Sequence, residues 1–195
     1  MKRYSILLLA VLLLAGLAAV GAEAQQASSG SSVLVVYFSC TGHTKKLAEM
    51  AADVLGADLY EIQAQQPYTD ADLNYNDSSS RTTKEMNDTS VRPAIGSEKI
   101  KNMDQYQIIF LAFPIWWGQA PRIIDTFLES YDFSGKTIVP FCTSMSSGIG
   151  SSAKNLHNLT NPKTVWLDGT RLDSSLSRDN MVKWIKSLKL KLTVK

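Results

Sequence analysis

Short apolar runs alternate with stretches of helical periodicity along most of this chain. Five apolar runs predict strands, at residues 33–38, 58–62, 108–113, 137–142 and 164–167. Apolar residues spaced as on one face of a helix predict helices at residues 44–55, 121–130, 151–156 and 178–188. Strands that alternate with helices are typical of an α/β fold, in which helices cover both faces of a parallel sheet.

Two segments fit this pattern less well. Pro140 lies inside the fourth apolar run, although a proline cannot donate to a strand ladder and is unwelcome in a central strand. Residues 63–107 are polar and much longer than an ordinary connection between a strand and a helix. Within them, residues 78–86 predict a helix capped by a serine, and residues 97–103 predict a second helix. The segment is either a decorated crossover or a lid over one edge of the sheet.

The first residues have the pattern of a targeting segment. Two basic residues precede an apolar run at residues 6–21, and Ala22-Glu23-Ala24 then places small residues at alternate positions. This order predicts a secretory signal peptide at residues 1–24, and therefore a protein exported to the periplasm or the extracellular space. The alternative is a membrane anchor that is not cleaved. Contact with a membrane is expected only through this segment.

The rest of the chain is predicted to form one domain. Residues 25–32 are small and polar and predict a disordered linker, residues 33–190 form the domain, and residues 191–195 predict a fraying tail. The formal net charge of +2 is close to neutral, which gives no support for nucleic-acid binding. His43 and His157 are far apart in the sequence, so no histidine cluster indicates a metal site.

Small and polar residues follow three of the predicted strands. In a doubly wound sheet, ligands bind beyond the carboxyl ends of the strands, and all three loops are expected at that edge. The loops are Ser39-Cys40-Thr41-Gly42-His43-Thr44, Pro114-Ile115-Trp116-Trp117-Gly118 and Thr143-Ser144-Met145-Ser146-Ser147-Gly148.

The first of these loops has the chemistry of an anion-binding site. It leads into a predicted helix, whose first backbone N–H groups and dipole favour negative charge. Gly42 permits close approach of the backbone, and Ser39, Thr41 and Thr44 add hydroxyl donors. A phosphate group suits such a loop, although an ordinary capped turn would have a similar composition.

The second loop contains two adjacent tryptophans, Trp116 and Trp117. Neighbouring side chains of an extended loop point to opposite sides, so one ring is expected to pack inward and the other to face a ligand by stacking. Which of the two faces the ligand is left open by the sequence. Gly118 and the Ser-Gly run at residues 146–150 are expected to let the backbone approach the ligand. For Gly148 and Gly150, the alternative is a simple turn.

Ser39, Thr41, Gly42 and Thr44 match the pattern Ser/Thr-x-Thr-Gly-x-Thr after a strand, which resembles the phosphate loop of the flavodoxin family. The PIWWG and TSMSSGIG segments are similar to the second and third flavin-contacting loops of that family, and the resemblance extends over residues 33–188. It implies a flavodoxin-like three-layer α/β/α sandwich, with a five-stranded parallel sheet in the order 2-1-3-4-5. It also implies that the protein binds FMN noncovalently.

The resemblance places the FMN contacts on all three loops, at Ser39, Cys40, Thr41, Gly42, His43, Thr44, Pro114, Ile115, Trp116, Trp117, Gly118, Thr143, Ser144, Ser147 and Gly148. The implied function is electron transfer through the flavin, with a redox partner protein or a small-molecule acceptor and with no catalytic side chain. One alternative is an NAD(P)H-dependent quinone reductase or a related oxidoreductase. Another is a flavin-free binding protein on the same fold.

Cys40 invites a different interpretation, because a cysteine that opens such a loop resembles the C-x5-R motif of low-molecular-weight protein tyrosine phosphatases. The sixth residue after Cys40 is Lys46, which cannot make the two-pronged contact of an arginine with phosphate. Cys40 and His43 also occupy the variable positions of the flavodoxin pattern.

In the strand order of that family, Cys40 and Cys142 lie about 9–10 Å apart, whereas a disulfide needs Cα atoms within about 7 Å. Both thiols are therefore predicted to be free.

Overall fold

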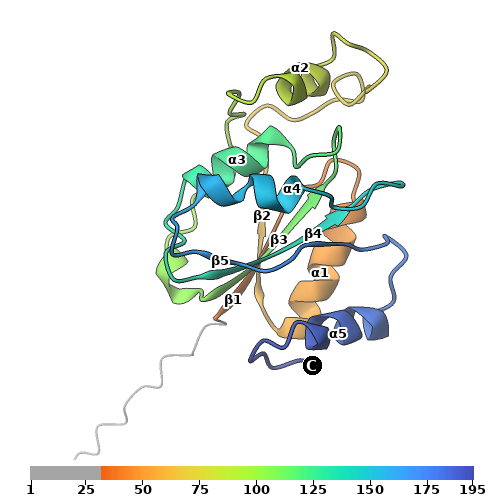
Figure 1. Ribbon diagram of the computed structural model, residues 1–195. Coiled ribbons are helices and arrows are strands. Elements are labelled where there is room, and N and C mark those ends of the chain that lie inside the picture. Colours follow the sequence, from red (N-terminus) through yellow and green to blue (C-terminus); the bar gives the residue numbers. More distant parts are fainter. Residues whose placement is uncertain (1–31) are drawn as a thin grey trace, which may run out of the picture.

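The computed structural model describes residues 32–195, and its centre is a parallel sheet (Figure 1). The strands are β1 (Val33–Tyr37), β2 (Asp58–Glu61), β3 (Ile108–Pro114), β4 (Thr137–Thr143), β5 (Val165–Trp166) and β6 (Thr170–Arg171). Every strand pair is parallel, and the neighbours follow the order β2-β1-β3-β4-β5, with β6 also paired to β4. The predicted α/β class and strand order are confirmed. The predicted signal peptide lies outside the described residues, as does the predicted linker apart from Ser32.

Helices cover both faces of the sheet. They are α1 (His43–Leu55), α2 (Arg81–Asn87), α3 (Arg122–Glu129), α4 (Ser152–Asn155) and α5 (Arg178–Ser187), with short 3-10 turns at Met103–Gln105 and His157–Leu159. Helices α1 and α5 lie on one face, whereas α3 and α4 lie on the other (Figure 1). Helix α2 stands apart from the sheet, on the side of α3.

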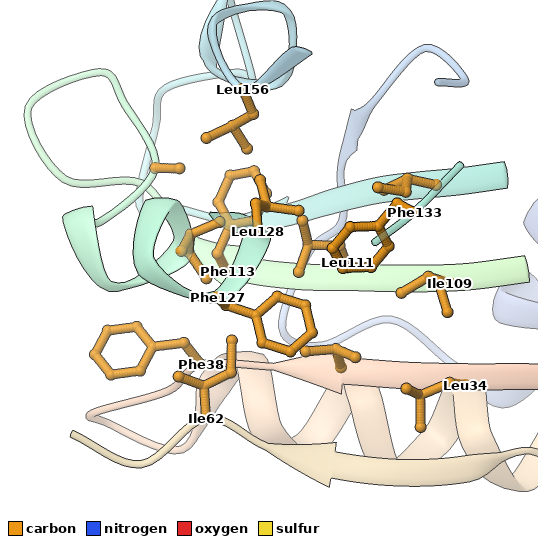
Figure 2. Packing of buried hydrophobic residues seen from close by; sticks show 14 of the residues in the cluster. Leu34, Phe38, Ile62, Ile109, Leu111, Phe113, Phe127, Leu128, Phe133 and Leu156 are labelled. Atoms are coloured by element: carbon orange, nitrogen blue, oxygen red, sulfur yellow. The ribbon is translucent and has the colours of Figure 1, made fainter. Parts of the chain in front are cut away.

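Alternate residues of the central strands enter two separate cores. On β3, Leu111 and Phe113 face α3, and Phe110 and Ala112 face α1 and α5. Figure 2 shows the first core, where Leu111 and Phe113 of β3 lie beside Phe127 of α3. Because both faces of the sheet are buried, its central strands have continuous apolar runs, which is the pattern that made them recognisable in the sequence.

Pro140 is accommodated in β4 because the strand beside it is interrupted. Leu167 donates its N–H to Ile138 O at 3.0 Å, and Leu172 donates its N–H to Cys142 O at 2.8 Å. Alternate residues of a strand direct their backbone groups to the same side, so Pro140 faces the gap between these two hydrogen bonds. The missing N–H of Pro140 therefore removes no hydrogen bond from the sheet.

The fifth position of the sheet is divided between two short strands. The apolar run at residues 164–167 predicts one strand, whereas the structure has β5 and then β6, with the chain leaving the sheet between them. Gly169 lies in this excursion, where a Cβ atom would come within 3.1 Å of Pro140 Cγ and would collide with Ile149 Cδ1. Strand β6 has no apolar run of its own, so local patterning did not predict it.

The long segment after β2 contains the first predicted helix but lacks the second. Ser80 is the N-cap of α2 and accepts a hydrogen bond from the Thr83 N–H, as the capping pattern indicates. The helix predicted at residues 97–103 is wrong, because most of that stretch is irregular and lies beside β2. There, Ser97 Oγ accepts a hydrogen bond from the Gln63 N–H and donates one to the Glu61 carbonyl, both at 2.7 Å. These tertiary contacts override the weak helix propensity of the segment.

The C-terminal residues, for which the sequence predicts fraying, lie against α1. The N–H of Lys195 donates to Val54 O at 2.8 Å, and Leu190, Leu192 and Val194 pack on the core beside α1. The alternating apolar side chains of this segment are the reason that it joins the fold. In the described part of the chain, no helix has both the length and the apolar character required to span a membrane.

Candidate functional site

The loop between β1 and α1 presents backbone donors at the carboxyl end of the sheet. Gly42 is the N-cap of α1, with a φ of 84°, and it has no side chain to accept hydrogen bonds from the first helical turn. The N–H of Gly42 itself donates to Ser39 Oγ at 3.1 Å. The first turn of α1 contains no acidic residue. Its N–H groups are therefore available to an anion.

Two hydrogen bonds join the end of β4 to the start of α1 and to the loop after β3. Thr44 Oγ1 and Thr143 Oγ1 lie 2.7 Å apart in a buried hydrogen bond. The Ile115 N–H donates to the Thr143 carbonyl at 2.9 Å. Thr143, at the end of β4, therefore connects the start of α1 with the loop that follows β3.

The loop after β3 closes in a tight turn at its tryptophans. Trp116 and Gln119 exchange both of their backbone N–H···O hydrogen bonds, each at 2.9 Å. Between them, Trp117 and Gly118 have φ values of 47° and 74°. Two positive φ values are the mark of a type I′ turn, and the conformation is energetically unfavourable for Trp117, which is not a glycine. The turn holds Trp117 at its tip with 42% of the residue exposed.

Trp116 has the opposite orientation and packs inward. Its ring makes edge-to-face contacts with Phe38 and Tyr68, at centroid distances of 5.6 and 5.3 Å. The structure thus answers the question that the sequence left open: Trp116 is the inward ring and Trp117 is the exposed one.

A charged cluster lies behind Trp116. The Tyr68 hydroxyl donates to Glu85 Oε2 at 2.7 Å, and Arg81 Nε donates to Glu85 Oε1 at the same distance. The Arg81 guanidinium also lies 3.9 Å from the centre of the Tyr68 ring, in a cation–π contact. Glu85 is only 7% exposed, and Arg81 compensates its buried charge. The cluster fixes Tyr68, which in turn supports Trp116.

Cys40 lies near this cluster but is not activated as a nucleophile. Although the residue as a whole is exposed, desolvation of the thiol raises the pKa of Cys40 to about 12, while Arg81 lowers this pKa and Glu85 raises it by smaller amounts. A thiol with this pKa is protonated at neutral pH. Both cysteines are free, and Cys142 is buried in β4.

Within residues 32–195, no group of three or more His, Cys, Asp or Glu side chains is placed to hold a metal ion.

The three loops surround a cavity of about 400 Å³, a size typical of small-molecule sites. The loops contribute Ser39, Cys40, Thr41, Thr44, Pro114, Ile115, Trp116, Trp117 and Met145 to its walls, and the segment after β2 contributes Leu73, Tyr75 and Thr82. None of these residues carries a formal charge. The cavity is thus mostly apolar, with the start of α1 at one side.

A second cavity of about 330 Å³ adjoins the first along β4. Its walls contain His43, Thr143, Ser144 and Ser174, together with four residues that also line the first cavity, Thr41, Pro114, Ile115 and Met145. The two cavities therefore form one continuous candidate site at the carboxyl ends of β1, β3 and β4.

Most residues that the sequence singled out line this candidate site, and four do not. Gly42, Gly118, Ser147 and Gly148 are absent from its walls. Gly42 and Gly118 instead shape the backbone beside the site, since one caps α1 and the other completes the tight turn. Gly42 and Gly118 therefore contribute through the backbone conformation that they permit, and not as residues of the cavity walls.

Sequence reasoning missed five lining residues, Leu73, Tyr75, Thr82, Met145 and Ser174. The first three come from the segment at residues 63–107, so part of that long connection is a wall of the site. Met145 lies inside the third predicted loop and could have been found from its position. Ser174 follows β6, which carried no signal in the sequence.

Comparisons with known proteins agree with this architecture. A family model described as Flavodoxin matches residues 32–188. A flavoprotein structure from Bacteroides eggerthii DSM 20697 is 44% identical, covering 82% of this chain and 98% of its own, with a TM-score of 0.76. Another from Bacteroides uniformis ATCC 8492 is also 44% identical, covering 80% of this chain and 99% of its own, with a TM-score of 0.75. A flavoprotein from Lactobacillus acidophilus NCFM in complex with FMN is 21% identical, covering 71% and 91% of the two chains with a TM-score of 0.57, and shares the fold. No curated protein matches the chain.

Proposed function

The chain belongs to the flavodoxin family, and from this premise we propose that it binds FMN noncovalently and transfers electrons through it. The observation that carries the proposal is the convergence of three loops on one uncharged cavity that begins at the N-terminus of α1. That arrangement offers an apolar space for a flat ring system beside donors for a phosphate. The FMN complex of the Lactobacillus acidophilus relative shows that the same fold accepts this cofactor.

The phosphate group is assigned to the loop that precedes α1. The backbone N–H groups of the first turn are available there, and no carboxylate of that turn competes for them. Thr41 lies in the walls of both cavities and adds a hydroxyl group. Thr44 has a different task, because its hydroxyl is already engaged with Thr143 and fixes the loop.

The ring system is assigned to the cavity beside the tryptophan turn. Trp117 offers an exposed aromatic face at the tip of the turn. Trp116 is held from behind by Phe38 and Tyr68 and keeps that part of the wall rigid. FMN, when bound, supplies the redox chemistry, and the chain binds it, orients it and excludes water from one of its faces.

A second candidate function is reduction of a small aromatic acceptor, such as a quinone, with electrons from a reduced nicotinamide. It is favoured by two exposed apolar residues on the cavity walls, Tyr75 at 68% and Met145 at 94% exposure. These side chains would contact a flat, uncharged molecule that approaches the cavity. Steady-state oxidation of NADH or NADPH with a quinone separates the two functions, because an electron carrier alone turns over neither nucleotide.

FMN binding is tested on the purified full-length protein. We expect a yellow protein that releases FMN on denaturation, and stripped protein that takes up FMN with quenching of flavin fluorescence. Thr41→Ala should weaken FMN binding several-fold and leave the affinity for riboflavin, which has no phosphate, almost unchanged. Thr89→Ala, an exposed threonine outside both cavities, is the matched control. A colourless protein that fails to take up added FMN would refute the proposal.

We also propose that the protein is exported, on the basis of the basic, apolar and small-residue pattern of residues 1–24. Cell fractionation, combined with N-terminal sequencing of the mature protein, tests this. A chain found in the cytoplasm with its first residues intact would contradict export, and a membrane-bound intact chain would favour the anchor instead.

A further inference from the structure

Arg171 holds the loop after β4 from its outer side. This residue lies on β6, where it is paired with Cys142 of β4. Its Nε donates to the Ser144 carbonyl and its Nη2 donates to the Met145 carbonyl, both at 3.2 Å. Asp173 Oδ2 also lies 4.0 Å from Nη2. One guanidinium group thus binds two successive backbone carbonyls.

These two hydrogen bonds determine where the next N–H groups point. In a trans peptide unit, the C=O and the N–H point in opposite directions, and the described residues contain no cis peptide bond. The carbonyls of Ser144 and Met145 point toward β6. The N–H groups of Met145 and Ser146, which belong to the same two peptide units, therefore point away from β6.

That direction leads toward the candidate site. Strand β4 has β6 on its outer side and β3 on its inner side. Ser144 and Met145 line the second cavity together with Thr41 and Pro114, which come from the loops on the inner side. Among residues 32–195, the backbone N–H groups of Met145 and Ser146 have no hydrogen-bond acceptor. Met145, which carries one of these two free donors, lines both cavities, and Ser146 follows it directly in the chain.

We infer that Arg171 is a positioning residue, which holds the N–H groups of Met145 and Ser146 toward oxygen atoms of the bound ring system. This inference rests on the proposed binding of FMN. The carbonyl oxygens of the flavin ring are uncharged acceptors that suit neutral N–H donors, whereas the phosphate is assigned to the start of α1. Arginine suits the task because its planar fork presents several donors at once, which the single ammonium group of lysine does not.

The test compares three variants of the full-length protein. Arg171→Met removes the fork and the charge, and Arg171→Lys keeps the charge without the fork. Arg178→Met is the matched control, since Arg178 pairs with Asp53 on α1 and makes no contact with the loop. FMN and riboflavin affinities come from fluorescence titration, and hydrogen exchange of residues 143–151 is measured by mass spectrometry in ligand-free protein.

We expect Arg171→Met to weaken FMN and riboflavin equally, by about 5- to 100-fold, because two oriented hydrogen bonds are lost. Arg171→Lys should give an intermediate loss and Arg178→Met a change of less than about twofold. The loop should exchange faster in both Arg171 variants, and the long-wavelength absorption band of bound FMN should shift. If Arg171→Met does not fold, the intermediate loss in Arg171→Lys decides the question.

Three results would overturn the inference. The first is a loss confined to FMN, which would place the effect at the phosphate. The second is an Arg171→Lys variant equal to wild type, which would make the charge alone sufficient. The third is unchanged exchange of the loop. Failure of wild-type protein to bind FMN would instead refute the proposed function, and the exchange experiment on ligand-free protein would still report whether Arg171 holds the loop.

Discussion

The conformation of Gly42 predicts a specific cost for replacing it with alanine. This residue is the N-cap of α1 and has a φ of 84°, in the left-handed region. A Cβ atom added there would meet no other atom within 4 Å. Steric collision with the rest of the protein is therefore excluded as a cause, and the backbone conformation alone determines the effect.

The magnitude follows from that conformation. An L-residue with a side chain pays roughly 1–2 kcal/mol to adopt the left-handed region. Gly42→Ala should thus lower the free energy of unfolding by about 1–2 kcal/mol, unless the backbone escapes to a negative φ. Such an escape would turn the first N–H groups of α1 away from the phosphate position, so FMN affinity should fall more than riboflavin affinity.

Urea unfolding followed by circular dichroism at 222 nm measures the change, and Gly148→Ala is the control. Gly148 lies outside the left-handed region, and a Cβ atom there would meet only the Gly150 nitrogen, at 4.0 Å. Alanine at this position should leave stability unchanged or raise it by up to about 1 kcal/mol, because it reduces the entropy of the unfolded chain. The reasoning is refuted if Gly42→Ala is as stable as wild type and binds FMN equally well.

Three other substitutions test separate parts of the structure. Gly169→Ala places a Cβ atom against the end of Ile149 and within 3.1 Å of Pro140 Cγ and 3.3 Å of Ala153 Cβ, which have less freedom to move, and should destabilise the protein by about 1–3 kcal/mol. A melting temperature equal to wild type would contradict the packing described here. Tyr68→Phe removes a hydrogen bond from buried Glu85 and should cost about 1–3 kcal/mol; urea unfolding measures this, and no loss would mean that Glu85 does not need that donor. The raised pKa of Cys40, about 12, predicts slow alkylation at pH 8 compared with a free thiol. For the same reason the difference in free energy of unfolding between wild type and Cys40→Ser should be independent of pH below the ordinary thiol pKa, and wild type should lose stability relative to Cys40→Ser as pH rises from that value toward 12.

Much of the candidate site could be predicted because its residues follow strands in the sequence. Parallel strands place their carboxyl ends at one edge of a sheet, so loops far apart in the chain must meet there. The meeting of Thr44 with Thr143 is an instance, since these residues are 99 positions apart and share a hydrogen bond. The pattern of apolar runs was sufficient to predict that edge without any knowledge of side-chain contacts.

Other parts of the site depend on contacts that have no local pattern. The helix predicted at residues 97–103 does not form, because Ser97 bonds to the backbone beside β2. Strand β6 consists of two residues that pair with β4 only because the chain returns to the sheet after Gly169. The hydrogen bonds of Arg171 on that strand to the loop after β4 could therefore not be predicted from the sequence.

The sequence by itself determined the α/β class, the strand order implied by its family resemblance, and the three loops of the site. These features depend on local periodicity and on a few residues with special backbone properties, such as Gly42. Only the tertiary structure decided that Trp116 packs inward and Trp117 is exposed, because the orientation of each ring depends on Phe38 and Tyr68. It also decided that residues 63–107 supply a wall of the cavity and that Arg171 donates hydrogen bonds to two carbonyls of the loop after β4. Such contacts join residues that are distant in the chain, and folding rather than local sequence brings them together.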